Sequence, residues 1–241
     1  MKLCVVVPCY NEEKRLKKNE FVSFLKEHPE IDFLFVNDGS SDKTIDILQE
    51  IESLAPNARS RNLVSNVGKA RAIQKGMVEC LELEYDFVGY FDADCATPLN
   101  EIPRFLEKLK NSEKTQLVMG SRILRLGGEV DRKWYRHLLG RLFATVASMT
   151  LRLPVYDTQC GAKFFKASLA KKIIHEPLVS YWIFDVELLF RMKKIKSHQE
   201  LKDSIYELPL NKWVDEAGSK LGPLDFLKAP LELFKIIMRY R

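Results

Sequence analysis

The sequence predicts an α/β fold in which helices cover both faces of a doubly wound, mostly parallel sheet. Apolar runs of strand length alternate with segments of helical composition in the first half of the 241-residue chain, which is typical of strands joined by crossover helices. Polar residues follow these runs, at the strand ends where such sheets bind ligands. A hydrophobic content of 46% and a charged content of 29% are ordinary for a globular protein.

Strands buried on both faces are expected as short apolar runs bounded by turn residues. The predicted strands are Leu3–Val7, Ile31–Val36, Arg61–Val64, Phe87–Phe91 and Leu117–Met119. The predicted helices are Glu12–Lys26, Lys43–Leu54, Lys69–Leu83 and Ile102–Leu109. Asp42 is expected to cap the second helix, since its carboxylate can accept hydrogen bonds from first-turn amides.

The cysteine pattern and the hydropathy predict a cytoplasmic chain. The five cysteines form neither a CxxC pair nor a zinc-binding spacing, and several lie in apolar runs, so we expect buried thiols in a reducing compartment. A strand begins almost at the N-terminus, which leaves no room for a signal peptide. The longest uncharged run in the middle of the chain, Leu142–Leu151, is about half as long as a membrane span requires.

Charge is distributed unevenly along the chain. Residues 1–120 carry 16 lysines and arginines against 20 acids, whereas residues 121–241 carry 22 against 13. The basic half is expected to meet an anionic partner, with nucleic acid and acidic lipid headgroups as candidates. The sequence contains no nucleic-acid-binding module, and its basic residues alternate with aliphatic helix faces, so no nucleic-acid partner is predicted.

Two carboxylates one residue apart, in Asp92-Ala93-Asp94, follow the apolar run Phe87–Phe91. Strand alternation would point both to one side, where they repel each other unless a cation such as Mg²⁺ or Mn²⁺ lies between them. An Asx-type turn is the alternative. Four more polar groups follow predicted strands: Tyr10-Asn11-Glu12, Asp38-Gly39-Ser40, Asn66-Val67-Gly68-Lys69 and Ser121-Arg122. Five such groups at one sheet edge favour a site over a set of coincidental turns.

These motifs resemble those of the family 2 glycosyltransferases of the GT-A fold, over most of the chain. The matching segments are Val5–Glu12, Val36–Thr44 and the metal motif Asp92-Ala93-Asp94. Later segments look like the branch that glycosylates polyprenyl phosphates, closest to dolichyl-phosphate β-glucosyltransferases: Tyr156–Phe165, Trp182–Glu187 and Gly218–Leu221. Mannosyl-transferring members usually carry Gln where this chain has Ala96, and Ser-Gly-Phe-Arg where it has Cys160-Gly161-Ala162-Lys163. The resemblance therefore favours UDP-glucose over GDP-mannose.

The resemblance implies a nucleotide pocket made of Pro8, Tyr10, Asn11, Glu12, Asp38, Gly68, Lys69, Asp92 and Ala93. Tyr10 would pack on the base, Glu12 would accept from ribose hydroxyls, and Asp38 would accept from a base N–H. Gly68 and Lys69, at a helix start, would approach the base or the phosphate. The alternatives are a plain helix start after Pro8, an Asp-Gly turn at Asp38 and a solvated helix residue at Lys69.

The resemblance also implies a catalytic centre with Mg²⁺ or Mn²⁺. Asp94 would bind the metal directly and Asp92 would be shared between the metal and the ribose, so that charge on the leaving diphosphate is neutralised. Arg122 would make a bidentate contact to phosphate. Asp185 stands where members with hydroxyl acceptors keep their catalytic base, and here it would only orient the sugar or the cationic cradle of the acceptor phosphate. Asp157 would be structural or would pair with Lys163.

The acceptor is expected at the basic half, with Arg136, Arg141, Lys163 and Lys220 as the cations for its phosphate. The stretch 132–156 holds five basic residues and no acid, with apolar residues at helical spacing. This predicts a helix resting on anionic headgroups, or alternatively an ordinary core helix. A second amphipathic segment could lie on a membrane, pack on the domain or form a homodimer; its apolar residues are Leu224, Leu227, Leu231, Phe234 and Met238.

The predicted organisation is a catalytic domain over residues 1–215 and a C-terminal amphipathic segment over 216–241, peripheral on the cytoplasmic face of a membrane. The predicted enzyme is an inverting hexosyltransferase that moves glucose from UDP-glucose to a polyprenyl phosphate. Transfer to a sugar hydroxyl and GDP-mannose-dependent mannosyl transfer are the alternatives. The lack of G-x-G-x-x-G after the first strand disfavours a dinucleotide-dependent oxidoreductase, while an inactive sugar-nucleotide binder stays open.

Overall fold

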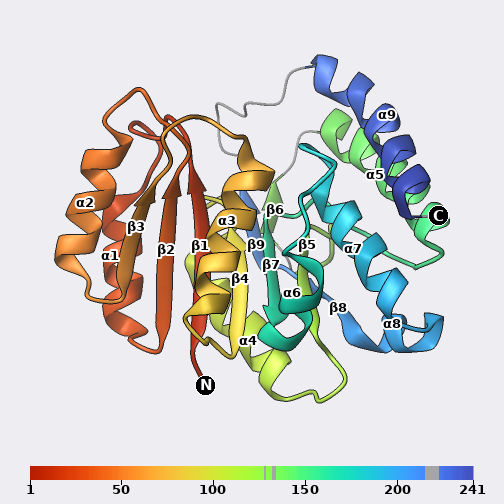
Figure 1. The fold of residues 1–241 in the computed structure, drawn as a ribbon, viewed down its shortest axis with the longest axis horizontal. Helices are drawn as coiled ribbons and strands as arrows, with labels where there is room; N and C mark the ends of the chain where they lie inside the picture. The colour runs from red at the N-terminus through yellow and green to blue at the C-terminus, as the bar shows by residue number, and fades with distance from the viewer. Residues whose placement is uncertain (128, 132–133, 215–222, 241) are drawn as a thin grey trace.

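A mixed seven-stranded sheet forms the centre of the molecule (Figure 1), whose computed structural model describes residues 1–127, 129–131, 134–214 and 223–240. The strand order is β3-β2-β1-β4-β7-β5-β8, and all neighbours are parallel except the two pairs made by β7. The strands are β1 (Leu3–Cys9), β2 (Ile31–Asn37), β3 (Ala58–Asn62), β4 (Phe87–Phe91), β5 (Leu117–Ser121), β7 (Ala162–Lys166) and β8 (Ile205–Pro209). A separate parallel pair joins β6 (Glu129–Asp131) to β9 (Lys212–Val214).

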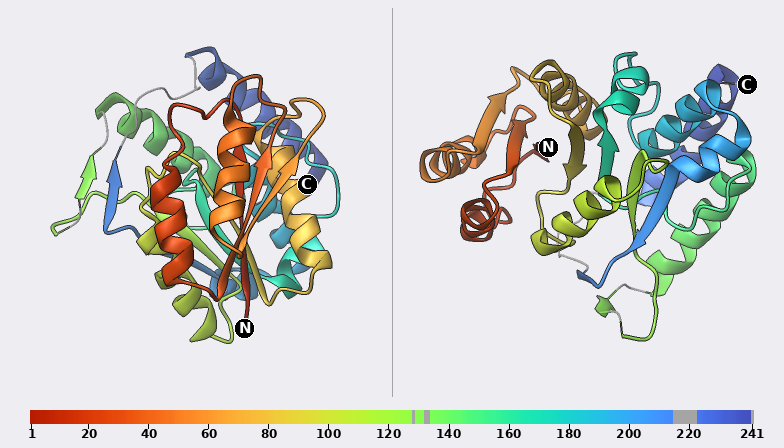
Figure 2. Two further views of the ribbon diagram at one scale, coloured as in Figure 1. Left: turned by 90° about the vertical axis from the view of Figure 1, so that its left-hand side faces the viewer. Right: turned by 90° about the horizontal axis from the view of Figure 1, so that it is seen from below.

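Helices lie on both sides of this sheet (Figure 2) and bury an apolar core on each face. One core is formed with α1 (Lys18–Glu27), α2 (Thr44–Leu54) and α4 (Ile102–Lys110), which follows the short 3₁₀ turn Leu99–Glu101. The other is formed with α3 (Lys69–Glu82), α5 (Trp134–Leu151), α6 (Ala167–Ile173), α7 (Phe184–Ile195), α8 (His198–Ser204) and α9 (Pro223–Tyr240). The predicted doubly wound α/β architecture is therefore confirmed.

Two predicted elements differ clearly in their bounds from the observed ones. The first helix begins at Lys18 rather than Glu12, because the residues between them form turns in which the amides of Arg15 and Leu16 bond to the Glu12 carbonyl. The third strand covers Ala58–Asn62 instead of residues 61–64. It is an edge strand that fully buries only its first residue, so it carries no apolar run to reveal it.

Strand β7 lies between β4 and β5 and runs antiparallel to both, which the sequence did not predict. Its sequence, AKFFK, alternates too little to stand out as a strand. Gly89 of β4 accommodates the ring of Phe164, since a Cβ at this glycine would lie 2.5 Å from that ring. The insertion brings Lys163 into the middle of the sheet, where its side chain is 1% exposed.

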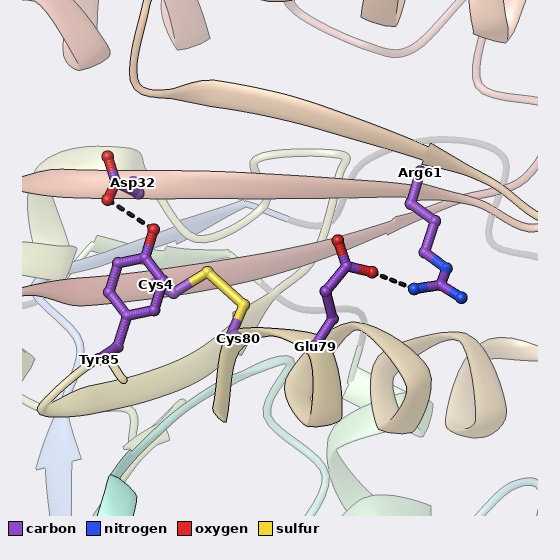
Figure 3. The surroundings of a disulfide bond; sticks show 6 residues. All are labelled: Cys4, Asp32, Arg61, Glu79, Cys80 and Tyr85. Atoms are coloured by element: carbon purple, nitrogen blue, oxygen red, sulfur yellow. Dashed lines mark hydrogen bonds and ion pairs between the residues drawn. A yellow bond between two sulfur atoms is a disulfide. The ribbon is translucent and has the colours of Figure 1, made fainter. Parts of the chain in front are cut away.

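Cys4 of β1 and Cys80 of α3 form a disulfide (Figure 3), so the expectation of five reduced cysteines is wrong for this pair. Their pairing follows from the close approach of α3 to the sheet: a Cβ on Gly76 would lie 2.6 Å from a methyl group of Val6. The remaining cysteines are buried thiols, as expected, namely Cys9, Cys95 and Cys160.

The C-terminal helix α9 packs against α7 and contributes Leu233 and Ile236 to the core they share. Its Leu231, Phe234 and Met238 are exposed. The predicted boundary after residue 215, and Lys220 with the motif around it, fall in residues 215–222, outside the described part of the chain. In the described part, no helix combines the length and the hydropathy needed to cross a bilayer.

Candidate active site

The loops after β1 and β2 are joined at the carboxyl edge of the sheet. The side-chain oxygen of Asn11 accepts from the amide of Ser41 at 2.8 Å, and the amide of Asn11 donates to the Ser40 hydroxyl at 2.9 Å. Pro8 lies within β1, and Tyr10 follows that strand with its side chain partly exposed. The predicted residues of the first two motifs therefore line one continuous edge.

Asp38 connects the loop after β2 to the start of α3. Its two carboxylate oxygens accept from the amides of Val67 and Gly68 at 2.8 and 2.9 Å. Gly39 makes this approach possible, since its φ is +65° and a Cβ there would lie 2.6 Å from the amide nitrogen of Asn66. The buried carboxylate thus shapes the loop that precedes Lys69, and its predicted contact with a nucleobase stays a prediction.

Asp92 faces α3 across the end of β4. Its Oδ1 lies 2.5 Å from the Nζ of Lys69. Burial alone would lower the pKa of Lys69, but the charges of Asp92 and its neighbours Asp185 and Asp94 raise it above its ordinary value. A Cβ on Gly161 would lie 1.9 Å from Asp92 Oδ2, so the absence of a side chain there leaves room for this carboxylate.

Asp94 is paired with Arg15, a residue that the motif-based analysis missed. The Arg15 guanidinium lies 2.9 Å from Asp94 Oδ2 and 3.6 Å from Glu12 Oε2, so it joins the first motif to the metal motif. Burial, and then repulsion from Asp92, raise the pKa of the Asp94 carboxyl above its usual value. The only signal in the sequence was the position of Arg15 three residues after Glu12.

Asp185 is buried at the first turn of α7 and accepts two hydrogen bonds at one oxygen. Lys163 of β7 lies 2.5 Å from Asp185 Oδ1, and the hydroxyl of Tyr90 in β4 donates to the same atom. Lys163 also donates to the carbonyl of Cys160 at 2.6 Å. The structure thus gives the ammonium of Lys163 two internal partners, and its predicted contact with an acceptor phosphate stays a prediction.

Arg122 and Asp157 form a bidentate pair beside the end of β5. The guanidinium donates at 2.6 and 2.8 Å, and the Arg122 amide donates to the same carboxylate at 3.1 Å. The Arg122 guanidinium also lies over the ring of Trp213, 5.4 Å from its centroid. The expected pairing of Asp157 with Lys163 is not observed, since Asp157 pairs with Arg122 and Lys163 with Asp185. The predicted contact of Arg122 with a phosphate stays a prediction.

Arg141 of α5 is a predicted acceptor cation whose side chain the structure describes. Its guanidinium donates to the Tyr156 carbonyl at 2.8 Å and lies over the Tyr156 ring, 3.8 Å from the ring centroid. Arg122, Arg141 and Asp157 line one small cavity of about 30 Å³. Arg136 lies on the same helix, but its side chain is outside the described residues.

A larger cavity of about 480 Å³ opens directly after the metal motif. Cys95 and Ala96 form part of its wall, and the cations around it are Lys17, Arg104 and Lys212. None of these three cations carried a motif that the sequence analysis could use. Lys17 directly precedes α1, whereas Arg104 lies in α4 and Lys212 in β9, and only the fold brings these elements together.

The two acids of the metal motif fit one divalent ion that arrives with a phosphorylated ligand. Among the described residues, no group of three or more His, Cys, Asp or Glu could hold an ion without help. Mg²⁺ is commonly held by one or two carboxylates together with substrate phosphates and water. Burial and then the repulsion from Asp92 raise the pKa of Asp94 despite the charges of Arg15 and Lys69, which suits a site that takes up a further cation. The cofactor prediction of Mg²⁺ or Mn²⁺ is consistent with this donor set.

The chain belongs to glycosyl transferase family 2, whose sequence model matches residues 4–174, and it is therefore a glycosyltransferase. The predicted family membership is confirmed by its relatives. A dolichyl-phosphate β-glucosyltransferase of Trichomonas vaginalis is 33% identical over 250 residues, covering 99% of this chain and 74% of that protein. The enzyme of the same name from Homo sapiens is 31% identical over 254 residues, covering 99% and 75%.

Solved structures confirm the predicted GT-A type of fold. Glucosyl-3-phosphoglycerate synthase from Mycobacterium tuberculosis, crystallised with Mn²⁺, uridine diphosphate and glucosyl-3-phosphoglycerate, superposes with a TM-score of 0.72. The alignment covers 98% of this chain and 80% of that chain, at 18% sequence identity. At this identity the likeness concerns the fold alone.

Replacing Gly161 with alanine is expected to lower glycosyl transfer at least about tenfold, because the new Cβ would collide with Asp92. Initial rates at saturating donor would measure the effect, and urea unfolding would show a cost of about 1–3 kcal/mol for overpacking. At Gly127 the φ of +79° also strains an added side chain, but its Cβ would meet nothing within 4 Å, so Gly127→Ala is the control for backbone strain without a collision at Asp92. Equal activities of the two variants would contradict the role assigned to Gly161.

The Arg122–Asp157 pair predicts a specific loss of stability in acid. Burial by itself would raise the pKa of Asp157, but the Arg122 charge and its hydrogen bonds hold that pKa well below the usual range. A depressed carboxyl pKa contributes stability above the unfolded value of about 4, which is lost as the pH falls below it. The free energy of unfolding of the wild type should therefore exceed that of Asp157→Asn at pH 6, and the difference between the two proteins should shrink below pH 4. For Asp46→Asn, on the exposed side of α2, no such convergence is expected.

Proposed function

We propose that this glycosyltransferase moves glucose from UDP-glucose to a polyprenyl phosphate of the dolichyl type, with a divalent metal. The observation that carries the proposal is the similarity, along 98–99% of the chain, to dolichyl-phosphate β-glucosyltransferases. The site supports it, because paired carboxylates and the cations beside them suit a nucleoside diphosphate. The Mn²⁺-bound and UDP-glucose-bound synthase with the same fold supports the metal and the donor by analogy.

The reaction is a single displacement at the anomeric carbon of glucose. A phosphate oxygen of the acceptor forms the new C–O bond on one face while the bond to the UDP oxygen breaks on the other, and UDP leaves with the electron pair. The α-linked donor therefore gives a β-linked product. Mg²⁺ or Mn²⁺, held by Asp94 and Asp92, would supply charge neutralisation for the leaving diphosphate.

The acceptor needs little help from a general base, because a phosphate monoester is already anionic at neutral pH. Asp185 has one oxygen engaged by both Lys163 and Tyr90. We therefore assign Asp185 to orienting the sugar rather than to removing a proton. The charge of Asp92 acts on both Lys69, at the start of α3, and Arg122, after β5, and these two cations would hold the diphosphate and the approaching anion close to each other.

A peripheral membrane contact would bring the lipid acceptor to this site. Leu142, Val146 and Met149 are exposed at helical spacing on α5. A second exposed apolar stripe, Leu231, Phe234 and Met238, lies on α9 beside the exposed Lys235 and Arg239. Apolar stripes with flanking cations suit an interface that carries anionic headgroups.

The test is a product assay with UDP-[¹⁴C]glucose, Mn²⁺ and a polyprenyl phosphate in detergent. The label should extract into organic solvent and return to water after mild acid, as expected for a glycosyl phosphate. Label that stays in aqueous oligosaccharide would favour the sugar-hydroxyl alternative. Faster turnover with GDP-[¹⁴C]mannose would favour the mannosyl alternative, and no turnover with any donor would favour an inactive binder.

A further inference from the structure

Glu232 of α9 holds the segment that leads into α7. Its Oε2 accepts from the hydroxyl of Ser180 and from the amide of Trp182, the latter at 3.1 Å. The Ser180 hydroxyl in turn accepts from the amide of Ile183 at 2.9 Å, at the start of α7. Asp185 follows in the first turn of that helix. One carboxylate on the C-terminal helix therefore fixes the entry to the helix that carries Asp185.

The same segment is fixed from α7 by Glu187, which is fully buried. Its carboxylate accepts from the amides of Val179 and Ser180, each at 2.9 Å, and from Arg191 at 2.7 Å. The Tyr240 hydroxyl, in the last turn of α9, donates to it at 2.8 Å. The middle and the last turn of α9 thus both contact α7 or the segment that leads into it.

Residues 179–183 also border the donor side of the site. The ring of Tyr181 lies 4.8 Å from the Arg71 guanidinium of α3, and a Cβ on Gly68 would lie 3.7 Å from that ring. Gly68 precedes Lys69, the partner of Asp92. A displacement of residues 179–183 would therefore disturb the region between the Lys69–Asp92 pair and Asp185.

We propose that Glu232 is a positioning residue for the transfer reaction. By fixing Ser180 and Trp182 it sets the start of α7, and with it the place of Asp185 relative to the Lys69–Asp92 pair. The inference rests on the proposed function and assigns to α9 a part in assembling the site. It also explains why a helix with an exposed apolar face keeps a carboxylate on its inner side.

The test compares Glu232→Ala with Glu232→Gln, using UDP-glucose and polyprenyl phosphate in detergent. The alanine variant should lose at least about tenfold in kcat. Its KM for UDP-glucose should change less than threefold, because the loops after β1 and β2 are held by their own hydrogen bonds. The glutamine variant should keep at least half of the wild-type kcat, since its amide oxygen can accept the same two bonds. Glu107→Ala, an exposed position on α4, is the matched control.

Ser180→Ala completes a double-mutant cycle, and the double variant should be no slower than Glu232→Ala alone. A folded Glu232→Ala protein with wild-type kcat, or additive losses in the cycle, would overturn the proposal. Amide exchange at Trp182 and Ile183 should accelerate in Glu232→Ala but not at Val67 and Gly68, and equal exchange in wild type and variant would also overturn it. If the wild type instead glucosylates a sugar hydroxyl, the proposed function fails, and the same variants assayed with that acceptor still decide the role of Glu232.

Discussion

Replacing Asp94 with asparagine is expected to lower glycosyl transfer about 10²–10³-fold. The amide would weaken the hold on the metal that neutralises the leaving diphosphate, a contribution of several kcal/mol, and each 1.36 kcal/mol is a tenfold change in rate. The thermal midpoint of the ligand-free protein should change little, because the lost ion pair with Arg15 is offset by the lost repulsion from Asp92. Initial rates with labelled UDP-glucose and a thermal melt measure the two quantities.

A binding measurement separates the metal role from a general defect in folding. Mn²⁺ added with UDP should raise the midpoint of the wild type by several degrees and that of Asp94→Asn by far less, since only binding to the native state stabilises it. Asp46→Asn, an exposed acid on α2, should behave as wild type in both assays. Turnover of Asp94→Asn within about threefold of the wild type would contradict the metal role.

The sheet edge could be predicted because parallel strands place their carboxyl ends together. Buried strands such as β1 and β4 appear in the sequence as apolar runs, and the residues after them, Asn11 and Asp92, must then meet at one edge. The structure also shows how the segments at this edge are connected, for example by the hydrogen bond from the Gly68 amide, before α3, to Asp38, after β2. Those connections depend on backbone amides, which carry no sequence signal.

The partners of the site residues could not be predicted, because they come from elements without a recognisable pattern. Strand β7 inserts antiparallel between two strands and brings Lys163 to Asp185, 22 residues further along the chain. Arg15 sits in a turn that composition assigns to a helix. Glu232 looks in the sequence like a solvated residue of an amphipathic helix, and only the packing of α9 on α7 turns it toward Trp182.

Replacing Lys163 with methionine is expected to cost about 3–5 kcal/mol of unfolding free energy, because it leaves the buried charge of Asp185 without its cationic partner. Urea unfolding at pH 7 measures the loss. Lys166→Met is the control on the same strand, since that residue is partly exposed and its ammonium donates to the carbonyls of Ser112 and Glu113, so its loss should cost about 1 kcal/mol.

The second substitution Asp185→Asn should restore part of the stability of Lys163→Met, because a neutral amide in the same place leaves no uncompensated charge. Transfer activity should stay low in the double variant, since the carboxylate assigned to orient the sugar is gone. The double variant would then recover stability without recovering activity, whereas a purely structural role of the pair predicts that the two recover together. A Lys163→Met protein no less stable than Lys166→Met would show that the Asp185 charge is satisfied by other groups, with Tyr90 as the first candidate.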